Sequence, residues 1–103
     1  MKTNYYILKD KKIVKVDLLT WSQWFENADN KRIALDKLPN GKRASTVFLG
    51  IDHGWGEGPP LLFETMVFSK NSYEDLDMER YSTYEEAEKG HKKMVKKWSK
   101  ELK

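Results

Sequence analysis

The chain has 103 residues, of which 39% are hydrophobic and 34% are charged, and its formal net charge is +3. This size predicts one domain, residues 1–103, and the 13% aromatic content argues against global disorder. Cys is absent, which excludes disulfides and Cys-based zinc sites. Apolar runs fall short of the roughly 18 to 20 residues that span a bilayer. Because the N-terminal sequence also lacks a signal-peptide pattern, a cytoplasmic protein without a membrane partner is expected.

The first segment predicts a hairpin followed by a short helix. Two β-branched and aromatic runs, 5–8 and 12–18, flank the polar residues 9–11. Thr20 and Gln23 have the spacing of a capping box, so a helix is predicted from Trp21 to about Ala28. Its aromatic side chains share one face, which indicates core packing or, alternatively, a stacking platform for a base or sugar: Trp21, Trp24 and Phe25.

The middle of the chain predicts three further strands. Residues 31–38 alternate in hydrophobicity, and Pro39-Asn40-Gly41 has turn chemistry. The next strands are predicted over 44–53 and 61–68, and the polar residues 70–80 are interpreted as a loop.

A long helix is predicted from Tyr84 to about Leu102, opened by a second capping box, Thr83 with Glu86. The element order is then ββα-βββα. The simplest architecture is α+β: one antiparallel sheet of about five strands, packed by the long C-terminal helix, with the short helix after the second strand.

Seven lysines lie between Lys89 and Lys103, after three glutamates of the same helix. This order suits the helix dipole and is typical of a solvated helix face. Basic tracts also bind phosphates, so a nucleic-acid partner stays open as a weaker alternative.

The central stretch, residues 45–68, offers the best candidate site. If its loop covers 54–60 and the strands pair symmetrically about Glu57, then Gly50 lies opposite Glu64 and Asp52 is a diagonal neighbour of Glu64. A glycine within a strand often marks a close approach by another group. Paired carboxylates in such a place can act as general acid and base, or bind a cation. A solvent-facing Glu64, or one bonded to Arg or Lys across the sheet, is the structural alternative.

Two histidines and one tryptophan extend this candidate site. His53 precedes the glycine-rich loop, and His91 lies on the apolar stripe of the last helix. Neither has zinc-motif spacing, and structural hydrogen bonding is the other interpretation of each. The loop contains GxGxG but is followed by Pro-Pro and a strand, so it does not predict a dinucleotide site. It is interpreted as a loop that displays Trp55 to a partner. The predicted binding residues are Asp52, His53, Trp55, Glu64 and His91; no catalytic residue, metal or cofactor is assigned.

Four blocks of the chain carry a resemblance to a known family. They read YYIL with VDLLTWSQWFE, then STVFLGIDH, GPPLLFETMVF and RYSTYEEAEKGH, and they run from Tyr5 to His91. By these blocks the chain resembles small uncharacterised proteins of tailed bacteriophages and prophages, although it is richer in lysine after His91. The resemblance implies a viral protein that acts in the host cytoplasm, and it assigns no activity or residue role.

Three functions remain open at this stage. The first is a phage-encoded protein that binds and modulates a host or antiviral-defence component. The alternatives are a small-molecule or nucleotide binder, or a small enzyme, with a site around Asp52, His53, Glu64 and His91. A role as a virion component is a weaker possibility, and the oligomeric state is open.

Overall fold

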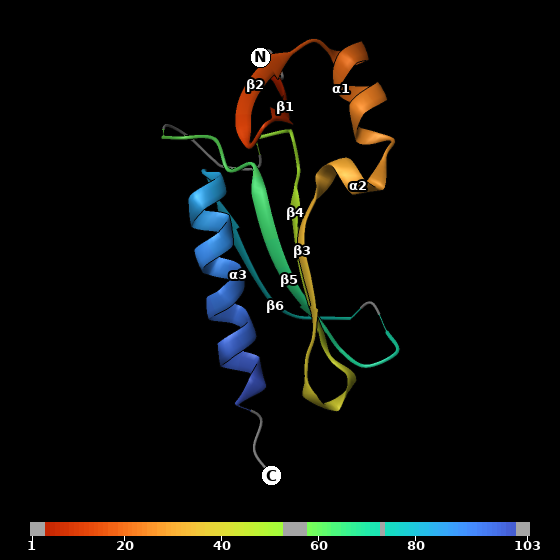
Figure 1. Cartoon of the computed structure of the whole chain (residues 1–103), viewed down its shortest axis with the longest axis vertical. Coiled ribbons are helices and arrows are strands. Elements are labelled where there is room, and N and C mark those ends of the chain that lie inside the picture. Colours follow the sequence, from red (N-terminus) through yellow and green to blue (C-terminus); the bar gives the residue numbers. More distant parts are fainter. Residues whose placement is uncertain (1–3, 53–57, 73, 101–103) are drawn as a thin grey trace.

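A computed structural model of the chain describes residues 4–52, 58–72 and 74–100 and has the predicted α+β fold. Its strands form two antiparallel sheets, of two and four strands, instead of the predicted single sheet of about five. Figure 1 shows α3 along one face of the larger sheet, with the smaller sheet and α1 near one end. The elements are β1 (Tyr5–Lys9), β2 (Lys12–Val16), α1 (Leu18–Phe25), α2 (Ala28–Lys31), β3 (Arg32–Lys37), the 3-10 turn η1 (Pro39–Gly41), β4 (Arg43–Phe48), β5 (Phe63–Phe68), β6 (Asp75–Tyr81) and α3 (Tyr84–Ser99).

The first hairpin forms as predicted, with β1 and β2 paired from Lys9↔Lys12 to Tyr5↔Val16. Its two turn residues, Asp10 and Lys11, have φ of 53° and 67°, the conformation that matches a two-residue turn to the twist of the strands. The free side of β1 is bridged by the chain after β4, through Tyr6 N–H and the Gly50 carbonyl at 2.8 Å.

The predicted start of the short helix is wrong by three residues. Asp17 is the N-cap of α1, and its carboxylate accepts a hydrogen bond from the Thr20 N–H at 3.0 Å. Thr20 therefore lies inside the helix, which ends at Phe25. A carboxylate at the N-cap satisfies a free helical N–H and suits the positive end of the helix dipole, so Asp17 begins the helix earlier.

The three aromatic side chains of α1 pack within the protein. The rings of Trp21 and Phe25 stack with centroids 4.7 Å apart, and Trp24 meets Phe48 edge-on at 5.5 Å. These contacts favour the core-packing interpretation over a stacking platform.

The four-stranded sheet has the order β3-β4-β5-β6. Its last strand, Asp75–Tyr81, lies mostly within the segment 70–80 that is interpreted from the sequence as a loop, and four acidic residues lie in or just before the strand. Those carboxylates are compatible with a strand because β6 is at the edge of the sheet, where side chains reach solvent and the lysines of α3.

The register of the central hairpin also differs from the prediction. β4 and β5 pair as Phe48↔Phe63, Thr46↔Thr65 and Ala44↔Val67, and all six side chains are fully buried. The predicted pairing, which placed Gly50 opposite Glu64, is therefore wrong by an odd number of residues, so the side chains of β4 lie on the opposite face from the one that this pairing implies. Gly50 lies beyond the end of β4 with φ of 76°, so β4 stops short of the predicted residue 53.

Helix α3 covers the face of the sheet that carries these buried residues. It begins at the predicted capping box of Thr83 and Glu86. Gly90 is needed for the packing, because a Cβ there would overlap the ring of Tyr81. Among the described residues the core consists of two clusters, one around Phe48, Leu62 and Phe63 and the other around Val67 and Met94.

Candidate functional site

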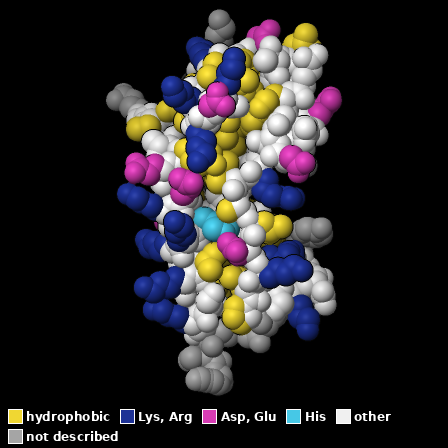
Figure 2. Space-filling model, in the orientation of Figure 1, with side chains coloured by type: hydrophobic (Ala, Val, Ile, Leu, Met, Phe, Trp, Pro, Cys, Tyr) yellow, Lys and Arg dark blue, Asp and Glu magenta, His cyan; other side chains and the backbone are white. Residues whose placement is uncertain are grey.

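A series of hydrogen-bonded polar side chains, here called the polar chain, lies between α3 and the sheet and is buried except at Asp36, whose side chain is 55% exposed. His91 is only 4% exposed, and its Nδ1 lies 2.7 Å from the Thr46 hydroxyl oxygen. Thr46 is in turn 2.5 Å from the hydroxyl oxygen of Thr65 on β5. On the other side of the ring, Nε2 lies 2.7 Å from a carboxylate oxygen of Asp36 on β3. Figure 2 shows a histidine near the middle of the view, beside an acidic side chain.

This arrangement resembles a catalytic Asp-His-hydroxyl set, but its burial argues for a structural role. A nucleophilic hydroxyl must reach the substrate, and the side chains of Thr46 and Thr65 are both fully buried. Both ring nitrogens of His91 are hydrogen-bonded, and each such bond offsets the cost of burying a polar group. The polar chain therefore connects α3 to three adjacent strands, β3, β4 and β5.

Tyr81 extends the polar chain toward β6. Its hydroxyl donates to a carboxylate oxygen of Glu79 at 3.0 Å. Burial, with this neighbouring carboxylate, raises the pKa of Tyr81 to about 12, and a hydrogen bond with Thr65 partly opposes the increase. Tyr81 is therefore neutral at physiological pH.

The predicted site does not assemble among its described residues. The Glu64 carboxylate binds the Arg80 guanidinium at 3.0 Å and lies opposite Val47 instead of Gly50. Asp52 accepts a hydrogen bond from the Leu61 N–H at 2.9 Å. His91 is on the α3-covered side of the sheet, whereas Glu64, next to the buried Thr65, points to the other side. The predicted site residues His53 and Trp55 lie outside the described residues.

Gly50 makes room for a different group from the one expected. A Cβ on this residue would overlap the indole nitrogen of Trp21. The glycine thus accommodates an aromatic side chain of α1 and does not lie opposite Glu64.

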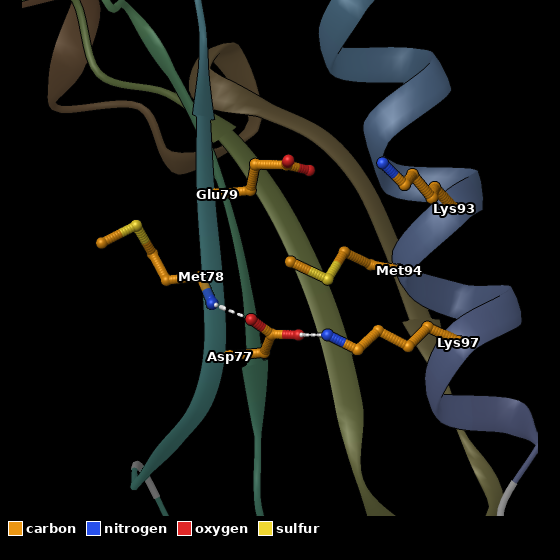
Figure 3. Close-up of a pocket in the computed structure, with 6 residues that line it drawn as sticks. All are labelled: Asp77, Met78, Glu79, Lys93, Met94 and Lys97. Atoms are coloured by element: carbon orange, nitrogen blue, oxygen red, sulfur yellow. Dashed lines mark hydrogen bonds and ion pairs between the residues drawn. The ribbon is translucent and has the colours of Figure 1, made fainter.

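A shallow pocket lies between β6 and α3 (Figure 3). Asp77 closes one end, where it binds Lys97 at 2.8 Å and the Trp98 indole N–H at 2.9 Å. These hydrogen bonds lower the pKa of Asp77, the one to Lys97 most strongly. The pocket volume is about 150 Å³, well below the roughly 300 to 1,000 Å³ of typical small-molecule sites.

The uncovered face of the four-stranded sheet, here called the open face, is the surface that the sequence interpretation missed. One row crosses all four strands through backbone pairing: Leu35, Ser45, Met66 and Met78. Its outer members are exposed, Leu35 by 48% and Met78 by 42%. Figure 3 shows Met78 pointing away from α3, opposite to Asp77 and Glu79.

Cationic residues flank this apolar row. The neighbouring row contains Arg32, Val47, Glu64 and Arg80, and the row on the other side contains Lys37, Arg43, Phe68 and Asp75. Four of these eight residues are cationic and two are acidic. The strand alternation could have revealed this face only with β6 recognised and the β4 register correct, because both decide which side chains share it.

Metal-site geometry, helix length and similarity to known proteins assign no function to this chain. Within residues 4–52, 58–72 and 74–100, no three His, Asp or Glu side chains gather as a metal site. Across the same residues, every helix is too short or too polar to cross a membrane. The chain matches no family model, no curated protein and no solved structure.

Proposed function

We propose that this protein is a binding module that modulates a component of a bacterial host or of its antiviral defence, with the open face of the four-stranded sheet as its docking surface. The apolar row from Leu35 to Met78 carries this proposal, because its two ends are exposed by 48% and 42% while α3 covers the opposite face. An apolar surface rimmed by polar residues is typical of an interaction site.

The composition of the face indicates the chemistry of the partner. Exposed cations border the apolar row on β3, at Arg32 and Lys37. The matching partner is a protein surface that combines apolar side chains with an acidic rim, because complementary charges steer association and exclude wrong partners. Met66 and Met78 are unbranched and adapt their shape to a partner.

The resemblance to small phage proteins supports a host protein as that partner. Small phage proteins without an enzyme signature often act by binding a host or defence component.

The alternatives of a small enzyme and a small-ligand binder have less support. The hydroxyls beside His91 are fully buried, and the pocket beside Asp77 has a volume of only about 150 Å³. Glu64, the central residue of the predicted site, is engaged by Arg80.

The test compares affinity capture from host cells by the wild-type chain and by the Leu35→Glu, Met78→Glu double variant. A host protein that binds through the open face is captured by the wild type and lost by this variant, since both charges lie in the apolar row. The interaction is then measured by calorimetry with the purified partner over a salt series. If the partner has an acidic rim, added salt should weaken the binding, because salt screens surface charges.

Two matched controls locate the binding surface. Leu19→Glu alters an apolar side chain on α1 that is 66% exposed, and it should leave capture unchanged. Lys92→Glu with Lys96→Glu reverses charges on the exposed side of α3 and should also leave it unchanged. Loss of the partner only in the α3 variant would place docking on the lysines and contradict the proposal.

A further inference from the structure

The outer edge of β2 is an unpaired strand edge with exposed apolar side chains. Its inner edge pairs with β1, and among the described residues no strand pairs with its outer edge. Ile13 and Val14, both in this strand, are each 37% exposed. These are two of the six large hydrophobic side chains exposed in the described part of the chain.

Such an edge is a template for another strand. Free N–H and C=O groups of an edge strand pair readily with a second chain unless charges, proline or a bulge prevent it. β2 has only Lys12 and Lys15 in this role. A two-stranded sheet is also marginal by itself, and a third and fourth strand stabilise it.

The turn of the first hairpin decides which backbone groups face outward. With a two-residue turn, Lys9 and Lys12 form the hydrogen-bonded pair that closes the hairpin, and the hydrogen-bonded pairs then alternate. Val14 thus bonds inward to Ile7, while the N–H and C=O groups of Ile13 and Lys15 point to the free edge.

We propose that a second copy of this chain pairs antiparallel with β2 across a two-fold axis at Val14, joining the two hairpins into one four-stranded sheet. In this register Ile13 of each copy exchanges backbone hydrogen bonds with Lys15 of the other, so the outward groups satisfy one another. Two Val14 side chains meet at the axis, where the strands of a non-hydrogen-bonded pair approach most closely. The two-fold arrangement is the commonest form of soluble oligomer.

Repulsion between lysines disfavours the neighbouring registers. Centring the axis on Val14 places Lys12 opposite Val16 and Lys15 opposite Ile13. An axis at Lys12 or Lys15 would place lysine opposite lysine, and an axis at Ile13 would place Lys15 opposite Lys11. Like charges directly opposite each other destabilise a strand pair.

An axis at Val16 is excluded for a different reason. It would require the pairing to continue into Leu18, which is already in α1. The Val14 axis is therefore the one that fits both the charges and the length of β2.

The experiment is sedimentation velocity of the full chain over a concentration series. The wild type is expected to show a concentration-dependent species of twice the chain mass. Val14→Lys and Val14→Glu each place two like charges at the axis and should remain monomeric. An equal mixture of the two variants restores opposite charges at the axis and should recover the dimer, which a folding defect would not do.

Leu19→Lys is the matched control, since it adds the same charge at a more exposed position outside the paired strand, and it should dimerise like the wild type. Circular dichroism and thermal unfolding show that each variant folds. A monomer at every concentration up to the solubility limit overturns the proposal, as do open-ended assemblies and a mixture of Val14 variants that stays monomeric. Because the residues differ from those of the open face, loss of this dimer leaves host-protein capture by Leu35 and Met78 unaffected.

Discussion

The two faces of the four-stranded sheet present opposite chemistry within the same strands. The face beneath α3 holds His91 and two threonines, yet its polar groups are hydrogen-bonded and nearly inaccessible. The open face has no histidine among its paired residues and exposes Leu35 and Met78. Residue types that are common in active sites therefore lie on the buried face here, and apolar residues lie on the exposed face.

The largest expected difference between the faces comes from two side chains of β5. Phe63→Ala removes a fully buried ring that packs against Phe48 and Tyr84, and it should lower the free energy of unfolding by about 3–5 kcal/mol. Met66→Ala, on the open face of the same strand, should cost less than half as much. Chemical denaturation of both variants measures the difference, and equal losses would contradict the assignment of the two faces.

A smaller difference is expected between adjacent residues of β4. Thr46→Val removes the hydroxyl that hydrogen-bonds both His91 Nδ1 and Thr65 and should destabilise the protein by about 1–3 kcal/mol. Ser45→Ala, on the open face, should stay within about 0.5 kcal/mol of the wild type. A neutral Thr46→Val would show that the polar chain does not hold α3 on the sheet.

Gly90 tests how closely α3 approaches the covered face. Alanine there gains about 1 kcal/mol of helix propensity, but its Cβ would overlap the Tyr81 ring and force a shift costing about 1–3 kcal/mol. We expect a net loss in thermal unfolding. The exposed Glu88→Ala in the same helix provides the matched control, and a stabilising Gly90→Ala would argue for looser packing.

The last expected effect is the alkaline dependence of stability that Tyr81 causes. Its pKa is raised from 10.0 to about 12 in the folded state, so the unfolded chain loses this proton first. The contribution of Tyr81 is therefore fully present below pH 10 and is lost as the pH rises toward 12. Unfolding free energies of the wild type and Tyr81→Phe, measured across this interval, should converge. Parallel curves would mean that burial does not raise the pKa of Tyr81.

Much of the fold was predictable because its signals are local. The turn at Asp10 and Lys11, the capping box at Thr83 and the amphipathic stripe of α3 all depend on residues close in sequence. Strand β6 was missed because it depends on tertiary context. Its carboxylates are tolerated because the strand lies at the edge of the sheet and because Lys97 of α3 pairs with one of them.

The candidate site was less predictable than the fold. Its geometry depends on the register of β4 against β5. The assumed symmetric loop gave a register wrong by an odd number of residues, which placed the side chains of β4 on the wrong face of the sheet. The structural alternative for Glu64, a cation across the sheet, is confirmed by Arg80. Gly50 did mark a close approach, but the neighbour is Trp21, far away in sequence.

Site-specific photo-crosslinking in host cells tests the role of the open face most directly. A crosslinking residue at Met78 should give one defined adduct with a host protein, and Leu35→Glu in the same chain should abolish it. The same residue at Leu19, on exposed α1, should not give that adduct. An adduct that forms equally from position 19, or that survives Leu35→Glu, would contradict the assignment of the open face as the docking surface.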